Sequence, residues 1–151
     1  MNETSRVLTI GYGNRALGQF YEVLEAFEVT HLVDVRSAPY SSYRKEFDRE
    51  ALTERHASGR VRYVYLGNEL GAIAVAENGE ALVRGLRRVF ESALKPSVRI
   101  CLMCGCLRPE RCHRGSALAP MLEALGLEVR HIDEFNRAVA TNELAVQPVL
   151  F

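Results

Sequence analysis

The sequence lacks an excess of charge of either sign, and it lacks a long apolar run. Its 151 residues include 19 Lys and Arg and 19 Asp and Glu, so the formal net charge is zero. A neutral chain has no global attraction for nucleic acid, so any such affinity must come from a local patch. No apolar segment approaches the roughly 20 residues that a membrane-spanning helix needs. The polar N-terminal residues show no secretory signal, so we expect a cytoplasmic protein without a membrane partner.

The chain also lacks the dispersed cysteines that are typical of a disulfide-stapled domain. Its four cysteines, at positions 101, 104, 106 and 112, lie within one short stretch. This clustering favours reduced thiols that serve a site. Repeats, low-complexity segments and Gly/Ser linkers are absent as well. The length suits one hydrophobic core, which predicts a single α/β domain over residues 1–151 with an irregular C-terminal tail from about residue 134.

Apolar runs that are typical of strands alternate with segments of helical periodicity. The predicted strands cover residues 7–10, 31–35, 61–66, 98–103 and 127–132. The predicted helices cover residues 17–27, 49–58, 82–93 and 118–125. This alternation predicts a three-layer, doubly wound, Rossmann-like sandwich of five mainly parallel strands, with helices on both faces. We expect the strand order 3-2-1-4-5, which makes the first and fourth strands neighbours at the switch point where such folds bind ligands.

The richest segment chemically leaves the fourth strand and enters a helix. It reads Cys-Gly-Cys-Leu-Arg-Pro-Glu-Arg-Cys-His-Arg over residues 104–114. Pro109 suits the first turn of a helix, which would place Cys112 near a helix N-terminus. The helix dipole and neighbouring arginines favour a thiolate at Cys112, and His113 adds a titratable imidazole. Arg114 and the free backbone N–H groups of a helix start would also suit an anion.

Competing interpretations of this segment remain open. Cys101 lies inside a strand and reads as a buried apolar residue, and Cys112 could be buried in the same way. Cys101 and Cys104 would point to opposite faces of the sheet, so they cannot chelate zinc together. A zinc site made of Cys104, Cys106, Cys112 and His113 stays geometrically possible, although we predict no metal. The spacing of cysteine and arginine does not fit a phosphatase loop.

Four segments together resemble the domain of unknown function 488 family. They are residues 9–15 (TIGYGNR), 32–39 (LVDVRSAP), 65–71 (YLGNELG) and 104–114. The likeness spans residues 9 to about 132, and the spacing from Cys104 to Cys112-His113-Arg114 is its most specific element. Two departures from the family pattern are Cys106, where members often carry Glu, and the Ser-Ser-Tyr-Arg run at 41–44. The resemblance implies a fold and a site but no reaction, and a link of some members to DNA repair.

The first loop carries glycines at positions that suit a phosphate. Residues 11–16, Gly-Tyr-Gly-Asn-Arg-Ala, fit a permissive dinucleotide pattern, and Asp34 follows on the second strand. We therefore assign Gly11, Gly13, Asn14 and Arg15 to anion binding. The chain is too short to add the catalytic domain that hydride transfer needs, so no cofactor is predicted. The competing interpretation is a tight strand-to-helix turn.

Asp34 and Arg36 share one face at the end of the second strand. They form either a structural ion pair or a positioned carboxylate and anion clamp beside Cys112. The loop that follows mixes Tyr40, Tyr43 and Arg44, which suits single-stranded nucleic acid as well as an ordinary exposed loop. His131 closes the fifth strand and reads as a core residue, with a place in the site as the alternative.

Two functional hypotheses follow. In the first, the domain is an enzyme for an anionic small molecule or nucleic acid, with Cys112 as thiolate, His113 as acid/base, Asp34 as orienting carboxylate, and Arg36 and Arg114 as anion clamp. In the second, it is a non-catalytic nucleotide- or nucleic-acid-binding module linked to DNA maintenance. The substrate and the oligomeric state do not follow from the sequence.

The C-terminal residues Gln147–Phe151 resemble the Q-x-x-L-F peptide with which bacterial DNA-maintenance proteins dock on the sliding clamp. Leu150 and Phe151 would fill a pocket of the clamp, and Gln147 would add a hydrogen bond. The alternative is that these apolar residues pack on their own domain.

Overall fold

One mixed sheet runs through the protein. The computed structural model describes residues 5–106 and 112–144. Six strands pair in the order β3-β2-β4-β1-β5-β6. They are β1 (Arg6–Gly11), β2 (His31–Asp34), β3 (Arg62–Tyr65), β4 (Ile100–Cys104), β5 (Glu128–Ile132) and β6 (Ala138–Ala140). The first five pair in parallel and β6 pairs antiparallel to β5, so the carboxyl ends of β1 to β5 share one edge, here called the carboxyl edge.

The predicted strands are confirmed, each within two residues of its expected bounds, but their expected order is wrong. In the structure β4 lies between β2 and β1, whereas the sequence analysis placed β1 there. All five residues of β4 are buried, and β1 is buried from its second residue onward. Both strands are therefore apolar on both faces, as central parallel strands are. Their sequences do not reveal which of the two lies next to β2. The expectation that β1 and β4 are neighbours is confirmed.

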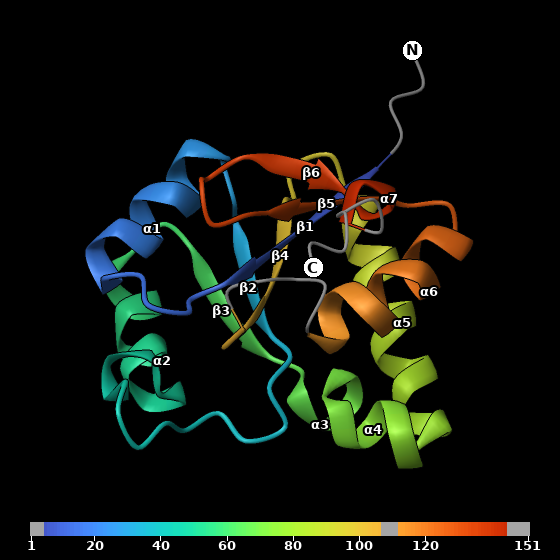
Figure 1. Cartoon of the computed structure of the whole chain (residues 1–151), viewed down its shortest axis with the longest axis horizontal. Coiled ribbons are helices and arrows are strands. Elements are labelled where there is room, and N and C mark those ends of the chain that lie inside the picture. The colour runs from blue at the N-terminus through green and yellow to red at the C-terminus, as the bar shows by residue number, and fades with distance from the viewer. Residues whose placement is uncertain (1–4, 107–111, 145–151) are drawn as a thin grey trace, which may run out of the picture.

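Helices cover both faces of this sheet, as the alternation of elements predicted. They are α1 (Leu17–Ala26), α2 (Arg49–Ser58), α3 (Gly67–Leu70), α4 (Ala72–Glu77), α5 (Gly79–Ala93), α6 (Ala119–Ala124) and α7 (Thr141–Leu144). A 3-10 turn, η1 (Lys45–Phe47), precedes α2, and a π-helical turn, η3 (Arg114–Leu118), runs into α6. Figure 1 shows α1 and α2 on one side of the sheet and α3 to α6 on the other. None of the helices in the described ranges is both long and apolar enough to cross a membrane.

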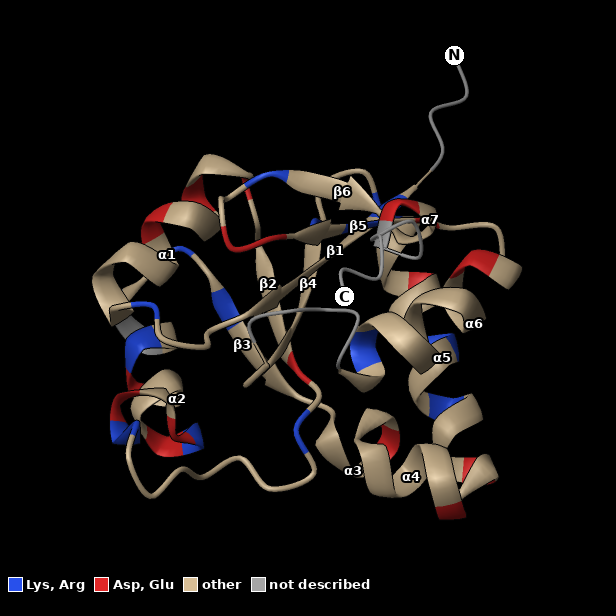
Figure 2. Cartoon of the chain, viewed as in Figure 1, with Lys and Arg blue, Asp and Glu red and all other residues tan. Residues whose placement is uncertain are grey.

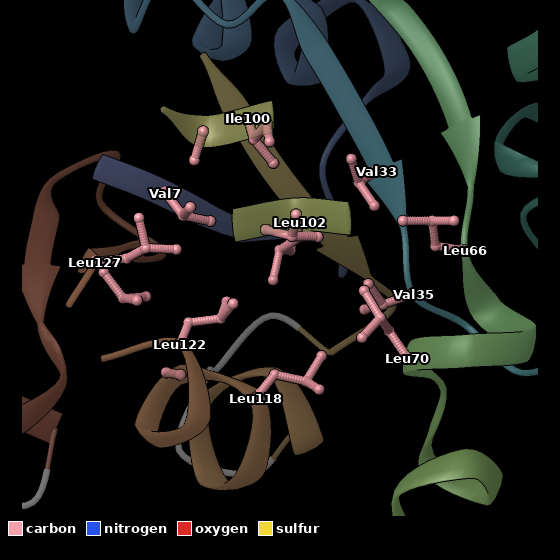
Figure 3. Packing of buried hydrophobic residues seen from close by; sticks show 14 of the residues in the cluster. Val7, Val33, Val35, Leu66, Leu70, Ile100, Leu102, Leu118, Leu122 and Leu127 are labelled. Atoms are coloured by element: carbon pink, nitrogen blue, oxygen red, sulfur yellow. The ribbon is translucent and has the colours of Figure 1, made fainter. Parts of the chain in front are cut away.

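Two apolar clusters fill the space between the sheet and its helical layers. On one face, side chains of β1, β2 and β4 pack with α5 and α6, and Figure 3 shows Leu118 and Leu122 turned toward Leu102. On the other face, Cys101 and Met103 of β4 pack with residues of α1 and α2. The alternation along β4 places Cys104 with the first cluster and Cys101 with the second, which confirms the expected opposite facing of these two thiols.

Two segments have more regular structure than expected. Residues 67–71, predicted as a loop, form α3 and lead into α4. The segment after residue 134, predicted as irregular, contains β6 and α7. A turn produces β6, because Asp133 accepts hydrogen bonds from the main chain of Phe135 and Arg137 and Asn136 adopts a left-handed φ of 63°. The sequence pattern of three strand residues is too short to predict this edge strand. The peptide Gln147–Phe151 lies outside the described residues.

Acidic and basic residues are distributed over the whole fold. Figure 2 shows both signs on the helical layers at either side of the sheet. This distribution agrees with the zero net charge. The charged groups that can mark a site are therefore the few that are buried. Among the described residues, Arg15, Asp34, Arg36 and Arg114 are buried charged groups, and His131 is a buried titratable one.

Candidate active site

Three loops meet at the carboxyl edge because β4 lies between β1 and β2. The loops after β1 and β2 lead to helices on one face, whereas the loop after β4 leads to η3 and α6 on the other. Adjacent strands with oppositely directed connections open a crevice where α/β folds bind ligands. Main-chain hydrogen bonds join the loops: Tyr12 N donates to Cys104 O at 3.1 Å, and Val35 N donates to Met103 O at 3.0 Å.

The centre of this edge is a group of three thiols, Cys104, Cys106 and Cys112, here called the thiol cluster. All three are free cysteines; Cys104 and Cys112 are buried, and Cys106 is exposed. The Sγ atoms of Cys104 and Cys112 lie 2.7 Å apart. Cys104 ends β4 and Cys112 lies just before η3, so the fold brings together two thiols that are eight residues apart in sequence.

The two buried thiols have opposite protonation preferences. A hydrogen bond from Cys104, assisted by His113 and by the main chain and charge of Arg114, outweighs burial and lowers the pKa of Cys112 to about 3. Burial and the neighbouring thiols raise the pKa of Cys104 well above its ordinary value. The pair is therefore a thiol that donates to a thiolate. Cys104 also lowers the pKa of Cys106, but one S–H serves one acceptor at a time, and the 2.7 Å separation favours Cys112.

His113 is held so that one ring nitrogen faces the thiolate. Its Nε2 lies 3.1 Å from Val35 O and 3.0 Å from Leu70 O, and carbonyl oxygens only accept, so Nε2 carries a proton. Its Nδ1 lies 3.7 Å from Cys112 Sγ. Burial opposes the charged imidazolium, but the hydrogen bond and charge of Cys112 and the two carbonyls outweigh it and raise the pKa of His113. Cys112 and His113 can thus form a thiolate–imidazolium pair.

Arg114 is fully buried and binds the cluster to the sheet. Its Nε donates to Cys104 Sγ at 2.9 Å, its Nη2 to Cys106 O at 2.9 Å, and its Nη1 to Thr9 Oγ1 at 2.6 Å. The sequence analysis expected Arg114 to clamp an external anion. The structure places its guanidinium against the protein's own sulfurs, where its charge favours a thiolate.

A polar chain continues from Arg114 across β1 and β5. Thr9 Oγ1 lies 2.6 Å from His131 Nδ1, and His131 Nε2 lies 2.9 Å from Thr141 Oγ1. Burial and the charge of Arg114 lower the pKa of His131 to about 4, so this imidazole is neutral near pH 7. Thr9 can then accept from Arg114 and donate to His131 Nδ1. His131, which the sequence analysis treated mainly as a core residue, is thereby connected to the site. The sequence analysis did not identify Thr9 or Thr141 as part of it. The only signal was one Thr in an otherwise apolar strand.

The thiol cluster could also hold a metal ion. The three sulfur atoms lie within 4.8 Å of one another, whereas His113 Nδ1 is near only one of them, at 3.7 Å from Cys112 Sγ, and does not belong to this group. Two thiolates on tetrahedral zinc, with Zn–S of about 2.3 Å, stand about 3.8 Å apart. The observed separation of 2.7 Å is shorter, and Arg114 places a cation at 2.9 Å from Cys104 Sγ. The guanidinium beside Cys104 Sγ argues against a second cation on the same sulfur.

Asp34 and Arg36 form a separate polar group on the opposite face of the same edge. Arg36 donates from Nε to Asp34 Oδ1 at 2.9 Å and from Nη2 to Asp34 Oδ2 at 2.8 Å, and also to Phe47 O. The Tyr63 hydroxyl donates to Asp34 Oδ2 at 2.6 Å. Burial, and secondly the nearby Asp34 carboxylate, raise the pKa of Tyr63. With a further bond from Arg36 N at 3.0 Å, the carboxylate accepts four hydrogen bonds from two residues beside the second apolar cluster. His113 is oriented by main-chain carbonyls, the role that sequence analysis gave to Asp34.

The glycine loop after β1 uses its main-chain groups inside the protein. Besides Tyr12, Gly13 N donates to Gly105 O at 3.1 Å and Arg15 N donates to Tyr12 O at 2.7 Å. A Cβ at Gly11 would lie 1.5 Å from Cys106 O, so glycine is required for the β4 loop to pass. Gly13 has a positive φ of 48°. These contacts explain both glycines as packing and turn residues, with Asn14 exposed between the loop and α1.

Arg15 is buried and connects this loop to the turn before β6. It donates to Gly11 O at 3.1 Å, to Asp133 O at 2.7 Å and to the side chain of Asn136. Burial and the charge of Arg114 lower the pKa of Arg15, partly offset by Asp133. Two buried guanidinium groups therefore repel one another at the carboxyl edge, and an anion nearby would relieve that repulsion.

The predicted site residues thus divide into groups. Cys112, His113 and Arg114 come together around Cys104 on one face, and Asp34 and Arg36 form an ion pair on the other. Arg15 follows β1 and is hydrogen-bonded to the turn before β6. Arg108, Pro109 and Arg111 lie outside the described residues. Cys104 was not among the predicted catalytic residues, since the sequence analysis considered it only as a possible zinc ligand.

Comparison with known families identifies part of the chain. Residues 16–79 match the model of the domain of unknown function DUF488. The comparisons with curated proteins and with solved structures gave no match.

The DUF488 match confirms the predicted resemblance over less than half of the chain. It includes the segments at 32–39 and 65–71, and therefore Asp34, Arg36 and the carbonyls that hold His113. The segments at 9–15 and 104–114, with Arg15 and the thiol cluster, lie outside it.

Proposed function

We propose that the protein is a cysteine-dependent enzyme that acts on a small anionic substrate at the carboxyl edge. Cys112 is the nucleophile, His113 returns a proton from Nδ1 to the leaving group, and Arg114 stabilises negative charge on sulfur. Asp34 has no part in this chemistry, because its carboxylate is already bound by Arg36 and Tyr63.

A single contact carries the proposal: Cys104 Sγ and Cys112 Sγ lie 2.7 Å apart, with Arg114 Nε 2.9 Å from the same Cys104 sulfur. A buried thiol that serves only for packing has no need of a thiol donor and a guanidinium beside it. Thiolates, not thiols, attack electrophiles, and electropositive surroundings of this kind are typical of reactive cysteines.

The preference for an anionic substrate rests on the buried charges. Arg15 and Arg114 are close enough for the charge of one to lower the pKa of the other. Arg15 donates to two main-chain carbonyls and to an amide, all of them neutral acceptors. A substrate anion at this edge would be attracted by both charges. We propose a small substrate because Cys112 is only 5% exposed, so that a bulky molecule would not reach its sulfur.

The proposal is tested by the pH dependence of alkylation. The exposed Cys106 would react as well, so the parent protein for the assay carries Cys106→Ser. We expect the iodoacetamide rate at Cys112, followed by peptide mass spectrometry, to stay nearly constant from pH 5 to pH 8. A rate that rises through a midpoint near the ordinary thiol pKa of about 8.5 would refute the thiolate. Cys112→Ser is the control for the site of labelling.

A second candidate function is the non-catalytic nucleic-acid-binding module. It is favoured by Tyr40 and Tyr43, which are exposed on the loop between β2 and η1, and by the exposed Lys45 at the start of η1. Exposed aromatic and basic side chains suit stacking and phosphate contact with a single strand. Tight binding of an oligonucleotide that is lost in Tyr43→Ala, together with ordinary reactivity of Cys112, would favour this function over catalysis.

A further inference from the structure

The thiol cluster contains a second buried thiol that nucleophilic attack alone does not require. Cys104 and Cys112 are 3% and 5% exposed, and both are unpaired thiols. Their sulfurs, at 2.7 Å, are only slightly farther apart than the roughly 2.05 Å of a disulfide. A small shift of either side chain would therefore join them.

The two sulfurs differ in a way that suits successive steps. Arg114 donates through its main chain to Cys112, and His113 Nδ1 faces the same sulfur, so negative charge is favoured on Cys112. Cys104 lies deeper, at the end of the central strand, and keeps its proton. A thiolate that attacks first and a neighbouring thiol that attacks it afterwards form a dithiol redox pair.

We propose that Cys104 is the resolving thiol of a two-cysteine cycle in which the protein reduces a small hydroperoxide. The inference rests on the proposed function in one respect, since Cys112 must first act as the nucleophile. It goes beyond that function in the substrate, because a hydroperoxide is neutral and is recognised by its O–O bond rather than by charge. Hydroperoxides fit the site because a few atoms suffice to reach a sulfur that is nearly buried.

The first step oxidises Cys112. Its thiolate attacks the terminal oxygen of the hydroperoxide, an S–O bond forms, and the O–O bond breaks. The departing alkoxide, or hydroxide in the case of hydrogen peroxide, takes the proton from His113 Nδ1, and Cys112 becomes a sulfenic acid. Arg114 lies beside the reacting sulfurs and stabilises the negative charge that develops on the leaving oxygen.

The second step forms the disulfide. Cys104 sulfur attacks the sulfenic sulfur, the S–S bond forms, and the S–O bond breaks. The proton of Cys104 leaves with the hydroxyl group as water. The hydroperoxide has then accepted two electrons from the two cysteines, and a dithiol reductant returns two electrons and two protons to restore the thiol, the thiolate and the imidazolium.

The experiment uses the full chain with Cys106→Ser as the parent, fully reduced and treated with one equivalent of hydrogen peroxide. We expect the intact mass to fall by two hydrogens and a proteolytic peptide pair to show a Cys104–Cys112 disulfide. With Cys104→Ser added, oxidation should stop at a sulfenic acid on Cys112 that a dimedone-type reagent traps. Peroxide consumption with dithiothreitol should fall more than about tenfold in Cys112→Ser, equivalent to about 1.4 kcal/mol of barrier.

The outcomes separate the two proposals. If Cys112 alkylates fast at low pH but accumulates sulfenic or sulfinic acid without a disulfide, the resolving role of Cys104 is refuted and the thiolate function survives. If Cys112 alkylates as an ordinary thiol, the proposed function fails as well. Zinc is measured on the protein with all four cysteines, because Cys106 belongs to the candidate metal group. Stoichiometric zinc in that protein, released when Cys112 is replaced by Ser, would overturn the cycle by showing that the sulfurs are metal ligands. The disulfide in the parent protein is the decisive reading, because it does not depend on the folding of the Cys104 variant.

Discussion

Two buried polar groups occupy the same edge of the sheet, one on each face, and they have opposite electrostatic designs. The pair of Asp34 and Arg36 is closed: the carboxylate receives bidentate donation from the guanidinium and a further hydrogen bond from Tyr63. The group around Cys112 is open: a thiolate is held by a thiol, an imidazole and a guanidinium. A carboxylate with all its donors in place is stable and unreactive, although Arg36 Nη1 is left buried without a partner among the described residues. A thiolate with weak donors keeps its nucleophilicity. Burial alone does not identify a functional charge; the chemistry of its partners does.

The largest effect should come from breaking the closed pair. Asp34→Ala leaves the buried charge of Arg36 without its partner, which typically costs about 3–5 kcal/mol. We expect urea denaturation to show a loss of that size. Glu128→Ala is the control, because its pairs with Arg6 and Arg130 are partly exposed and each such pair contributes at most about 1 kcal/mol.

The same variant sharpens the comparison of the two faces. If the faces are independent, any Asp34→Ala protein that remains folded should alkylate at Cys112 at the parental rate. A large loss of thiol reactivity at unchanged stability would show instead that Asp34 takes part in the chemistry.

Removing the cation from the open group should affect reactivity first. Arg114→Met keeps much of the buried volume and removes the charge near both sulfurs, so the pKa of Cys112 should rise. We expect the midpoint of the pH profile of Cys112 alkylation, near pH 3 in the parent, to move to a higher pH in Arg114→Met, with less thiolate at every pH below the new midpoint. Arg15→Met should have a smaller effect, because Arg15 donates to carbonyls and to Asn136.

The open group should also make stability depend on pH. The pKa of Cys112 is about 3 in the folded protein and about 8.5 in an unfolded chain. Between these values the unfolded state binds one more proton, so the thiolate contributes stability that is complete above about pH 8.5 and is lost as the pH falls toward 3. The difference in unfolding free energy between the parent and Cys112→Ser should therefore grow from pH 5 to about pH 6.5. Above that pH the raised pKa of His113, which depends on the same thiolate, contributes with the opposite sign. A difference that is constant over this range would contradict a thiolate in the folded state.

The smallest effect concerns the phenol on the closed side. Tyr63→Phe removes one of the hydrogen bonds to Asp34 and leaves the ion pair intact. Hydrogen bonds to charged groups are worth about 1.5–3 kcal/mol. We expect a loss near the lower end of that range in thermal unfolding, because Arg36 still compensates the carboxylate. A loss as large as that of Asp34→Ala would show that the phenol, rather than the guanidinium, carries the pair.

Local sequence signals predicted most of the elements but only part of the site. Helix α2 begins after Asp48 and ends before Gly59, as expected, although Asp48 accepts from Ser41 N rather than capping the helix with its side chain. Cys112, His113 and Arg114 are consecutive, so their common location followed from the chain itself. Their partners Cys104, Thr9 and His131 come from three different strands. No local pattern marks residues that are paired only through the sheet.

The alternation of apolar and periodic segments by itself determined an α/β protein with parallel strands, helices on both faces and functional loops at one edge. These features follow from residue spacing, which acts over a few neighbours. Only the tertiary structure decided that β4 lies between β2 and β1, and hence that Cys104 meets Cys112 on one face while Asp34 meets Arg36 on the other. The physical reason is that β1 and β4 are apolar on both sides, so their order depends on how whole layers pack and not on any pattern within a strand.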